Sequence, residues 1–270
     1  MSYLEELYSL KDKTAVVIGG GGVLAGCMAE GLAKAGANVV ILDLNLENGQ
    51  TKAEQISELG VRSTAIRADA SNKNDLQEAA NQVIKEFGSI DIVINAPGIN
   101  SATPFFEISE EEWDKIININ LKSMYLSSQV FGKIMIEAKS GGCFINISSV
   151  SSSLPLSKVF TYSISKAGVN NLTQFLAKEW APYNIRVNAI APGFFPAEQN
   201  RKILTQDRIN SIFSHTPMNR FGDPGELIGA TICFSGQEKD RYFRFRLPQG
   251  IDARDVAPRL CMRDRHAILG

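Results

Sequence analysis

The sequence has almost no net charge, with 28 basic residues against 29 acidic ones over 270 positions. Without an excess of positive charge, the chain has no general attraction for nucleic acid or for an anionic membrane. No apolar run approaches the roughly 20 residues of a membrane span, and the acidic segment MSYLEELYSLKDK at the N-terminus lacks the apolar core of a secretion signal. We therefore expect a cytoplasmic protein that binds neither nucleic acid nor a membrane.

Cysteine is scarce, and its spacing excludes two further classes of protein. The residues Cys27, Cys143, Cys233 and Cys261 lie far apart and form no CxxC pair, which disfavours structural zinc and a disulfide framework. We predict no metal site and interpret the cysteines as small apolar residues. Because the sequence also lacks repeats, low-complexity tracts and Pro/Ser-rich linkers, we expect a single domain over residues 1–270.

Short apolar runs alternate with longer segments of helical period, which predicts an α/β fold. One helix places Leu24, Met28 and Leu32 on a single face, a second begins after the N-cap Ser109, and a third spans Ala167–Ala181. The alternation predicts a Rossmann-like, doubly wound parallel sheet with helices on both faces and ligands at the carboxyl ends of its strands. The predicted strands are Thr14–Ile18, Asn38–Leu42, Ser63–Arg67, Ile90–Asn95, Cys143–Ile147 and Arg186–Ile190.

Four consecutive glycines, Gly19–Gly22, follow the first predicted strand and precede a helix. Such a loop brings backbone N–H groups close to a phosphate, although a glycine turn that binds nothing would look the same. The second predicted strand is followed by Asp43, about 20 residues further on, where an acid accepts hydrogen bonds from the ribose hydroxyls of NAD and repels a 2′-phosphate. We therefore expect the cofactor to be NAD rather than NADP.

The segment YSISK places Tyr162 and Lys166 four residues apart, on one face of a helix. A lysine ammonium near a phenol lowers the tyrosine pKa, and this would make Tyr162 a general acid and base. A YxxxK pair alone is more often a solvated helix face. Here, however, Ser149 lies 13 residues upstream in INISS, and Asn120 lies in ININL within a preceding helical pattern.

Over about residues 10–235 these motifs resemble the short-chain dehydrogenase/reductase family. Asn120, Ser149, Tyr162 and Lys166 match its four catalytic residues, and the segments RADAS, DIVINAPG and RVNAIAPG match three further motifs. The resemblance implies an NAD-dependent enzyme, usually a tetramer, that interconverts a ketone and a secondary alcohol. It assigns the cofactor to Gly19, Gly22, Val23, Leu24, Asp43, Asp69, Ala70, Asn95, Gly98, Tyr162, Lys166, Pro192 and Gly193.

The same resemblance implies a role for each of the four catalytic residues. Tyr162 passes the proton, and Lys166 lowers its pKa and holds the nicotinamide ribose. Ser149 polarises the reacting oxygen, and Asn120 fixes a water that links Lys166 to solvent.

Four residues depart from the family pattern. Ile18, Val23 and Ala25 replace the Thr and two of the Gly of the family loop TGxxxGxG, so that the loop is similar to a subgroup reading TGGGGVLG. Ala197 stands where many members carry a Thr that bonds the nicotinamide amide.

The segment from about 194 to 218 is expected to form a lid over the substrate. Its sequence resembles the D-mannonate oxidoreductase (fructuronate reductase) group, and Ser149, Gln199 and Arg201 would supply the hydrogen bonds and the cation that a sugar acid needs. For each lid residue, a merely solvated helix is an equal alternative. The other functions left open are a gluconate 5-dehydrogenase, a 3-oxoacyl carrier-protein reductase and a non-catalytic NAD-binding protein.

The tail from about 236 to 270 does not resemble the family, which normally continues with FVTG, a strand and a VDGG turn. Seven arginines crowd this segment, and the alternation around Phe243–Leu247 would also fit a half-buried edge strand. One extra T would convert codons for Phe-Val-Ser-Gly into codons for Phe-Arg-Phe-Arg, the residues at 243–246. We therefore hypothesise an out-of-frame tail that weakens assembly through this edge, which resequencing the gene tests.

Overall fold

A six-stranded parallel sheet forms the centre of the protein, in a computed structural model that describes residues 7–154, 156, 158–196, 205–214 and 216–236. The strand order is β3-β2-β1-β4-β5-β6, with every neighbouring pair parallel. This confirms the predicted fold class, and each strand lies within two residues of its predicted bounds. The strands are β1 Thr14–Ile18, β2 Asn38–Asp43, β3 Ser63–Arg67, β4 Ile92–Asn95, β5 Gly142–Ile147 and β6 Ile185–Ile190.

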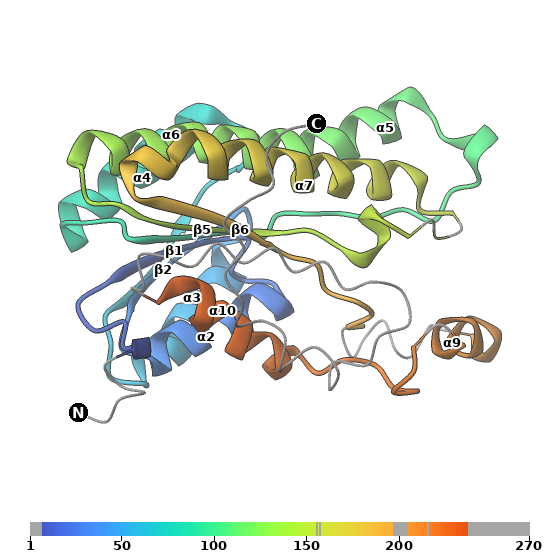
Figure 1. The fold of residues 1–270 in the computed structure, drawn as a ribbon, viewed down its shortest axis with the longest axis horizontal. Helices are drawn as coiled ribbons and strands as arrows, with labels where there is room; N and C mark the ends of the chain where they lie inside the picture. The colour runs from blue at the N-terminus through green and yellow to red at the C-terminus, as the bar shows by residue number, and fades with distance from the viewer. Residues whose placement is uncertain (1–6, 155, 157, 197–204, 215, 237–270) are drawn as a thin grey trace, which may run out of the picture.

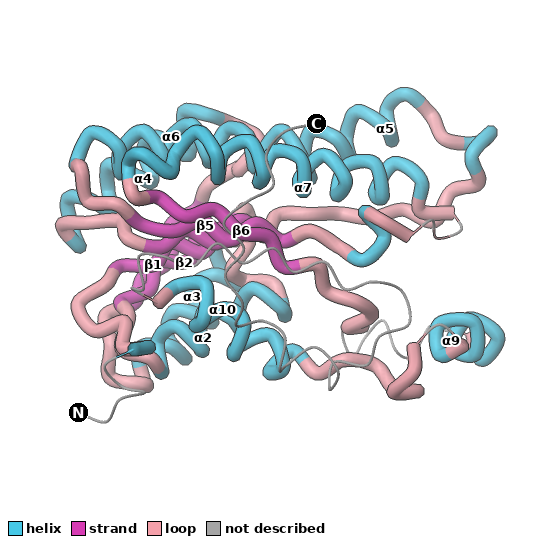
Figure 2. The backbone as a smooth tube through the Cα atoms, viewed as in Figure 1, coloured by secondary structure: helices cyan, strands magenta, loops and turns pink. Residues whose placement is uncertain are grey.

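Helices cover both faces of the sheet, as Figures 1 and 2 show. One face carries α2 Val23–Lys34, α3 Leu46–Ser57 and α10 Ile228–Ser235, and the opposite layer contains α4 Lys73–Phe87, α5 Glu110–Ile117, α6 Ser123–Ala138 and α7 Phe160–Trp180. Helix α9, Gln206–Phe213, lies apart from both layers, at the end of the molecule toward which β6 points (Figure 1). Within the described ranges, no helix is both long and apolar enough to cross a membrane.

Each face of the sheet has its own apolar core because the central strands are buried on both sides. Along β1, Val17 packs with Met28 and Leu32 on the α2 side. The neighbouring Val16 packs in the cluster that contains Phe131 on the opposite side.

Cys27, Cys143 and Cys233 are free thiols, and burial raises the pKa of Cys143 to about 11.

Two helix boundaries differ in how well the sequence predicted them. Ser109 caps α5 as predicted, because its hydroxyl accepts a hydrogen bond from the Glu112 N–H at 3.1 Å. The predicted start of the third helix at Ala167 was wrong, since α7 begins at Phe160. Its N-cap, Val159, makes no side-chain cap hydrogen bond, so the usual start signal is missing from the sequence.

A buried hydrogen-bonded chain of polar side chains joins the ends of β4 and β5 to the helices above them. Asn95 Nδ2 donates to Asn146 Oδ1 at 2.8 Å, and Asn146 Nδ2 donates to Thr173 Oγ1 on α7 at 2.9 Å. Ser127 Oγ on α6 donates to Asn95 Oδ1 at 2.8 Å. Both asparagines are fully buried, so every partner in the chain matters for satisfying a buried polar group.

We predict that Asn146→Ala lowers the free energy of unfolding by about 1–3 kcal/mol, because it leaves the buried Asn95 Nδ2 without its acceptor and removes one of the two hydrogen bonds of Thr173 Oγ1. Urea denaturation measures this change. The control is Asn171→Ala, an exposed position on α7, where we expect a change within about 0.5 kcal/mol. Equal effects of the two substitutions would contradict the prediction.

Candidate active site

The carboxyl ends of the strands bring together segments that are far apart in the sequence. The strand order reverses between β1 and β4, which makes the crevice between them a topological switch point where ligands bind in such sheets. The glycine loop follows β1, Asp43 ends β2, Gly98 follows β4 and Ser149 follows β5. All four therefore lie along one edge of the sheet.

The glycine loop approaches the neighbouring backbone so closely that only glycine fits at its first position. Gly19 has a φ of +74°, and an added Cβ would lie 3.2 Å from the Pro97 nitrogen. Its N–H donates to the Leu42 carbonyl at 2.7 Å. Helix α2 starts directly after the loop with Gly22 as its N-cap and no side-chain cap, and Val23 is 56% exposed. These features suit the backbone cradle of a pyrophosphate, so the loop fits a dinucleotide.

Backbone donors hold both oxygens of the Asp43 carboxylate. Gly21 N–H donates to Oδ2 and Asn45 N–H donates to Oδ1, each at 2.9 Å. Lys52 is ion-paired with Glu30 of α2 at 2.6 Å. Besides Lys52, a second cation lies near Asp43, and no sequence pattern indicated it. Arg67 of β3 is exposed and pairs in register with Asp43.

Asp69 and Ala70 follow β3 and lie next to the end of β2, since the Ala68 N–H donates to the Asp43 carbonyl at 3.0 Å. Asp69 Oδ1 accepts from both the N–H and the hydroxyl of Ser71, at 2.8 and 2.7 Å. These two predicted cofactor residues therefore lie in a hydrogen-bonded turn beside Asp43.

The side chains of Asn120 and Lys166 meet at Gly98. A Cβ added to Gly98 would lie 3.3 Å from Lys166 Nζ and 3.7 Å from Asn120 Oδ1. Asn120 lies in a π-helical turn, Asn118–Lys122, between α5 and α6. Its buried amide donates to the Ile99 carbonyl at 2.9 Å and to Ser165 Oγ at 3.1 Å, and accepts from the Ile99 N–H at 2.8 Å. This side chain thus fixes the loop that follows β4.

Lys166 is a buried cation, with only 3% of the residue exposed. Its ammonium donates to the Ile147 carbonyl at the end of β5, at 2.7 Å, and lies 5.8 Å from the centre of the Tyr162 ring. Burial lowers the pKa of Lys166 from 10.5 to about 8, because loss of water disfavours the charged form.

The expected lowering of the Tyr162 pKa by Lys166 was wrong for this structure. Burial raises the pKa of Tyr162, and a hydrogen bond with Ser149 opposes that rise. Desolvation dominates because the ammonium of Lys166 is bound to Ile147 rather than directed at the phenol oxygen. Ser149 itself is buried, and its hydroxyl oxygen accepts from the N–H and the hydroxyl of Ser151, at 3.2 and 3.1 Å.

Several other predicted cofactor residues lie at this edge with differing exposure. Pro192 and Gly193 follow β6, and the Pro192 carbonyl accepts from the Val150 N–H at 3.1 Å. Leu24 lies in the first turn of α2 and is half-buried. The Asn95 side chain is fully buried in the hydrogen-bonded chain described above, so any effect it has on a cofactor passes through the end of β4.

The predicted lid is described only at its two stems and around α9. Ala197, Gln199 and Arg201 lie outside the described residues, as does the arginine-rich tail. The first stem is held by the segment just after the lid, because the Gly222 N–H donates to the Phe194 carbonyl at 2.9 Å.

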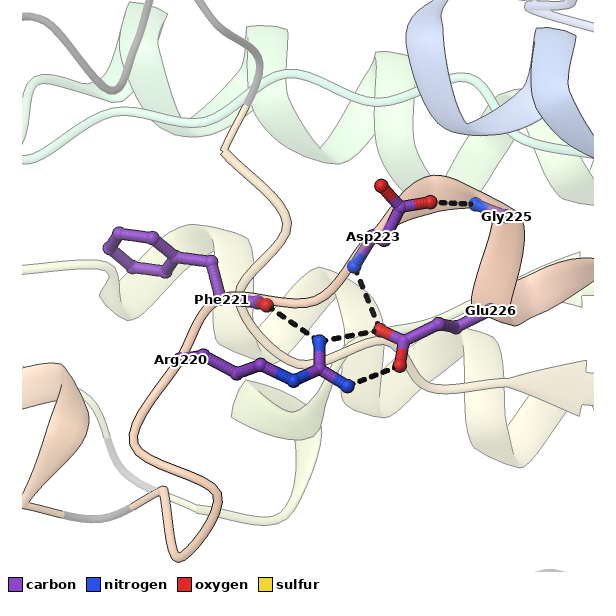
Figure 3. A network of polar contacts seen from close by, with 5 residues as sticks. All are labelled: Arg220, Phe221, Asp223, Gly225 and Glu226. Atoms are coloured by element: carbon purple, nitrogen blue, oxygen red, sulfur yellow. Dashed lines mark hydrogen bonds and ion pairs between the residues drawn. The ribbon is translucent and has the colours of Figure 1, made fainter.

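Figure 3 shows the polar contacts beside the second stem of the lid. Arg220 Nη1 donates to Glu226 at 3.0 Å, and the second guanidinium nitrogen of Arg220 also contacts this carboxylate. The Asp223 N–H donates to Glu226 at 2.8 Å, and Asp223 Oδ1 accepts from the Gly225 N–H. The base of the lid is thus a hydrogen-bonded turn.

A second contribution that sequence reasoning missed comes from Glu112 on α5. Its two carboxylate oxygens accept hydrogen bonds from Ser101 Oγ at 2.6 Å and from Thr103 Oγ1 at 2.8 Å. It therefore holds the loop after β4 a few residues beyond the point where Asn120 holds it. In the sequence, the N-cap Ser109 indicated only that a helix starts near Glu112.

Three comparisons with known proteins agree with this arrangement. The pattern of the family described as short chain dehydrogenase matches residues 13–208. The 5-keto-D-gluconate 5-reductase of Escherichia coli is 33% identical over 238 residues, which cover 88% of this chain and 93% of that protein.

Two solved structures share the fold over most of their length. A protein from Haemophilus influenzae, proposed to be a D-mannonate oxidoreductase and solved with bound NAD, is 34% identical with a TM-score of 0.80, covering 85% of this chain and 90% of that one. A gluconate 5-dehydrogenase from Burkholderia cenocepacia, in complex with NADP and tartrate, is 29% identical with a TM-score of 0.82, covering 87% of this chain and 92% of that one.

The pKa of Lys166 predicts how stability depends on pH. Between about pH 8 and 10.5 the unfolded chain binds more protons than the folded chain, so the free energy of unfolding rises with pH. The full shift corresponds to about 3 kcal/mol. We predict that the stability difference between wild type and Lys166→Met, measured by urea denaturation at each pH, rises by about this amount over that window.

Other titrating groups are present in both proteins and cancel in this difference. The control is Lys178→Met, at an exposed position on the same helix, for which the difference should not change with pH. A constant difference for Lys166→Met as well would contradict the assignment of a buried, desolvated ammonium.

Proposed function

The chain belongs to the short-chain dehydrogenase family, and from this premise we propose that it is an NAD(H)-dependent oxidoreductase that interconverts a ketone and a secondary alcohol. The observation that carries this proposal is the gathering of Ser149, Tyr162 and Lys166 at the carboxyl ends of the strands, on the same edge as the glycine loop. The uncapped start of α2 and the Asp43 carboxylate on that edge support a dinucleotide as the second ligand.

A bound nicotinamide cofactor would supply or accept the hydride, and the residues of the chain would handle the proton. Burial raises the pKa of Tyr162, so the phenol remains protonated at neutral pH and can donate its proton to a carbonyl oxygen. The Ser149 hydroxyl, whose interaction with Tyr162 opposes the rise in the Tyr162 pKa, would hold the same oxygen. In the opposite direction Tyr162 must first lose its proton so that it can accept one from the alcohol, and Lys166 would hold the nicotinamide ribose.

We assign Asn120 a positioning role within this mechanism. Its side-chain amide is bound to Ile99 and Ser165, and the second lone pair of Oδ1 would accept from a water that links Lys166 to solvent. The Asn120 side chain also keeps the loop at Gly98 against Lys166.

For the substrate we propose a sugar acid such as fructuronate or mannonate. The similarity to a D-mannonate oxidoreductase supports this choice, and the similarity to the gluconate enzymes supports a 5-ketogluconate substrate equally well. Arg201 and Gln199 of the lid remain our proposed partners for the carboxylate and hydroxyl groups. For the cofactor we propose NAD, on the position of Asp43; one similar structure holds NAD and another holds NADP.

We further propose that the protein works as a homo-oligomer in the cytoplasm. Tyr125 of α6, together with Ile164 and Phe175 of α7, is more than a third exposed, which leaves apolar surface for a second copy of the chain. The free thiols Cys27, Cys143 and Cys233 suit a reducing compartment.

The proposed function is tested by following NADH oxidation against a panel of keto-sugar acids and 3-ketoacyl thioesters. Turnover of a keto-sugar acid is the expected result. Turnover of thioesters alone would favour the carrier-protein reductase instead, and cofactor binding without any turnover would favour a non-catalytic NAD-binding protein.

We predict that Tyr162→Phe lowers kcat by about 10²–10⁴-fold, the usual contribution of a general acid, while NADH still binds. Steady-state kinetics and cofactor fluorescence measure the two properties separately. Tyr183→Phe makes the same chemical change at an exposed position and should leave kcat unchanged. If Tyr162→Phe retains more than about a tenth of kcat, Tyr162 is not the general acid.

A further inference from the structure

The third glycine of the loop, Gly21, is required by space rather than by backbone conformation. Gly19 is the glycine of this loop with a positive φ, and Gly21 does not share it. A Cβ added to Gly21 would lie 2.9 Å from Asp43 Oδ2 and 2.9 Å from the Cβ of Asn48. A side chain at this position would therefore displace the Asp43 carboxylate.

Gly21 also belongs to a chain of hydrogen bonds that passes through Asp43 into α3. Its N–H donates to Asp43 Oδ2 at 2.9 Å, and the Asn45 N–H donates to Oδ1 at 2.9 Å. Asn45 in turn caps α3, since its Oδ1 accepts from the Asn48 N–H at 3.2 Å. The carboxylate is thus held from the loop on one side and from the helix cap on the other.

We propose that Gly21 is a specificity-determining residue, which selects NAD over NADP by holding the Asp43 carboxylate in a single orientation. This inference rests on the proposed function, in which Asp43 faces the adenosine ribose. A carboxylate repels a 2′-phosphate strongly only if it cannot turn away, because a side chain free to rotate into solvent avoids most of the repulsion. The two backbone hydrogen bonds prevent that rotation.

The loop offers a matched control for this role. Gly22 has φ −76° and ψ 158°, a conformation open to alanine. A Cβ added there would approach only the Gly19 carbonyl, at 3.3 Å. Gly22→Ala therefore adds the same methyl group to the same loop but directs it away from Asp43.

The experiment titrates the purified wild type, Gly21→Ala and Gly22→Ala proteins with NADH and with NADPH, and follows the fluorescence of the cofactor. We expect wild type to prefer NADH. In Gly21→Ala this preference should fall by about tenfold or more, as expected for the loss of one hydrogen bond to a charged group. Gly22→Ala should weaken both cofactors by the same factor and keep the preference.

The outcomes separate this inference from the proposed function, because binding is measured without a substrate. If wild type binds neither cofactor or prefers NADPH, the proposed NAD site and the inference both fail. If wild type prefers NADH but Gly21→Ala keeps that preference, or weakens both cofactors equally, the inference alone is overturned.

A second variant guards against misfolding of Gly21→Ala. In the double variant, Gly21→Ala is combined with Asn48→Gly, which removes the clash with the Asn48 Cβ. Asp43 Oδ2 is then the one side-chain atom left within 3 Å of the new methyl group. We expect the same loss of preference in the double variant. A folded double variant with the wild-type preference would overturn the inference.

Discussion

The close approach of three backbone segments at the switch point of the sheet is the constraint on which the rest of the site depends. The Gly19 N–H reaches the Leu42 carbonyl of β2 at 2.7 Å, while the Ala96 N–H reaches the Ile18 carbonyl of β1 at 3.0 Å. A side chain on Gly19 would meet Pro97. Because these segments touch, the glycine loop, Asp43 and the loop at Gly98 are held at fixed positions relative to one another.

The chemistry of the site requires polar groups in a place that the fold otherwise keeps dry. The Lys166 ammonium is buried away from water and donates a hydrogen bond to the Ile147 carbonyl instead. The Asn120 amide donates to the Ile99 carbonyl and to Ser165 Oγ. Each group is held by backbone or by a neighbouring helix, and such partners are necessary because an unpaired polar group in this environment costs about 1–3 kcal/mol. The fixed positions of these side chains are therefore a consequence of their burial.

Much of this protein follows from the sequence by itself. Apolar runs of strand length predicted the six strands, because a parallel strand that is buried on both faces consists of nearly continuous apolar residues. Ser109 identified the start of α5, since a capping hydrogen bond is a local interaction. Asp43 and Ser149 at the strand ends, together with the YSISK segment of α7, pointed to a dehydrogenase before any geometry was known. The roles of these residues remain proposals.

Only the tertiary structure decided how these groups affect one another. The pKa of Tyr162 rises instead of falling because burial outweighs the opposing contribution of Ser149, while the Lys166 ammonium is bound to the Ile147 carbonyl. Strand register places Arg67 beside Asp43, although 24 residues separate them in the sequence. The contact between Gly21 and Asp43 likewise requires the packing of a loop against a neighbouring strand. Burial and register depend on segments far away in the chain, so no local pattern encodes them, whereas strand runs and helix caps are local.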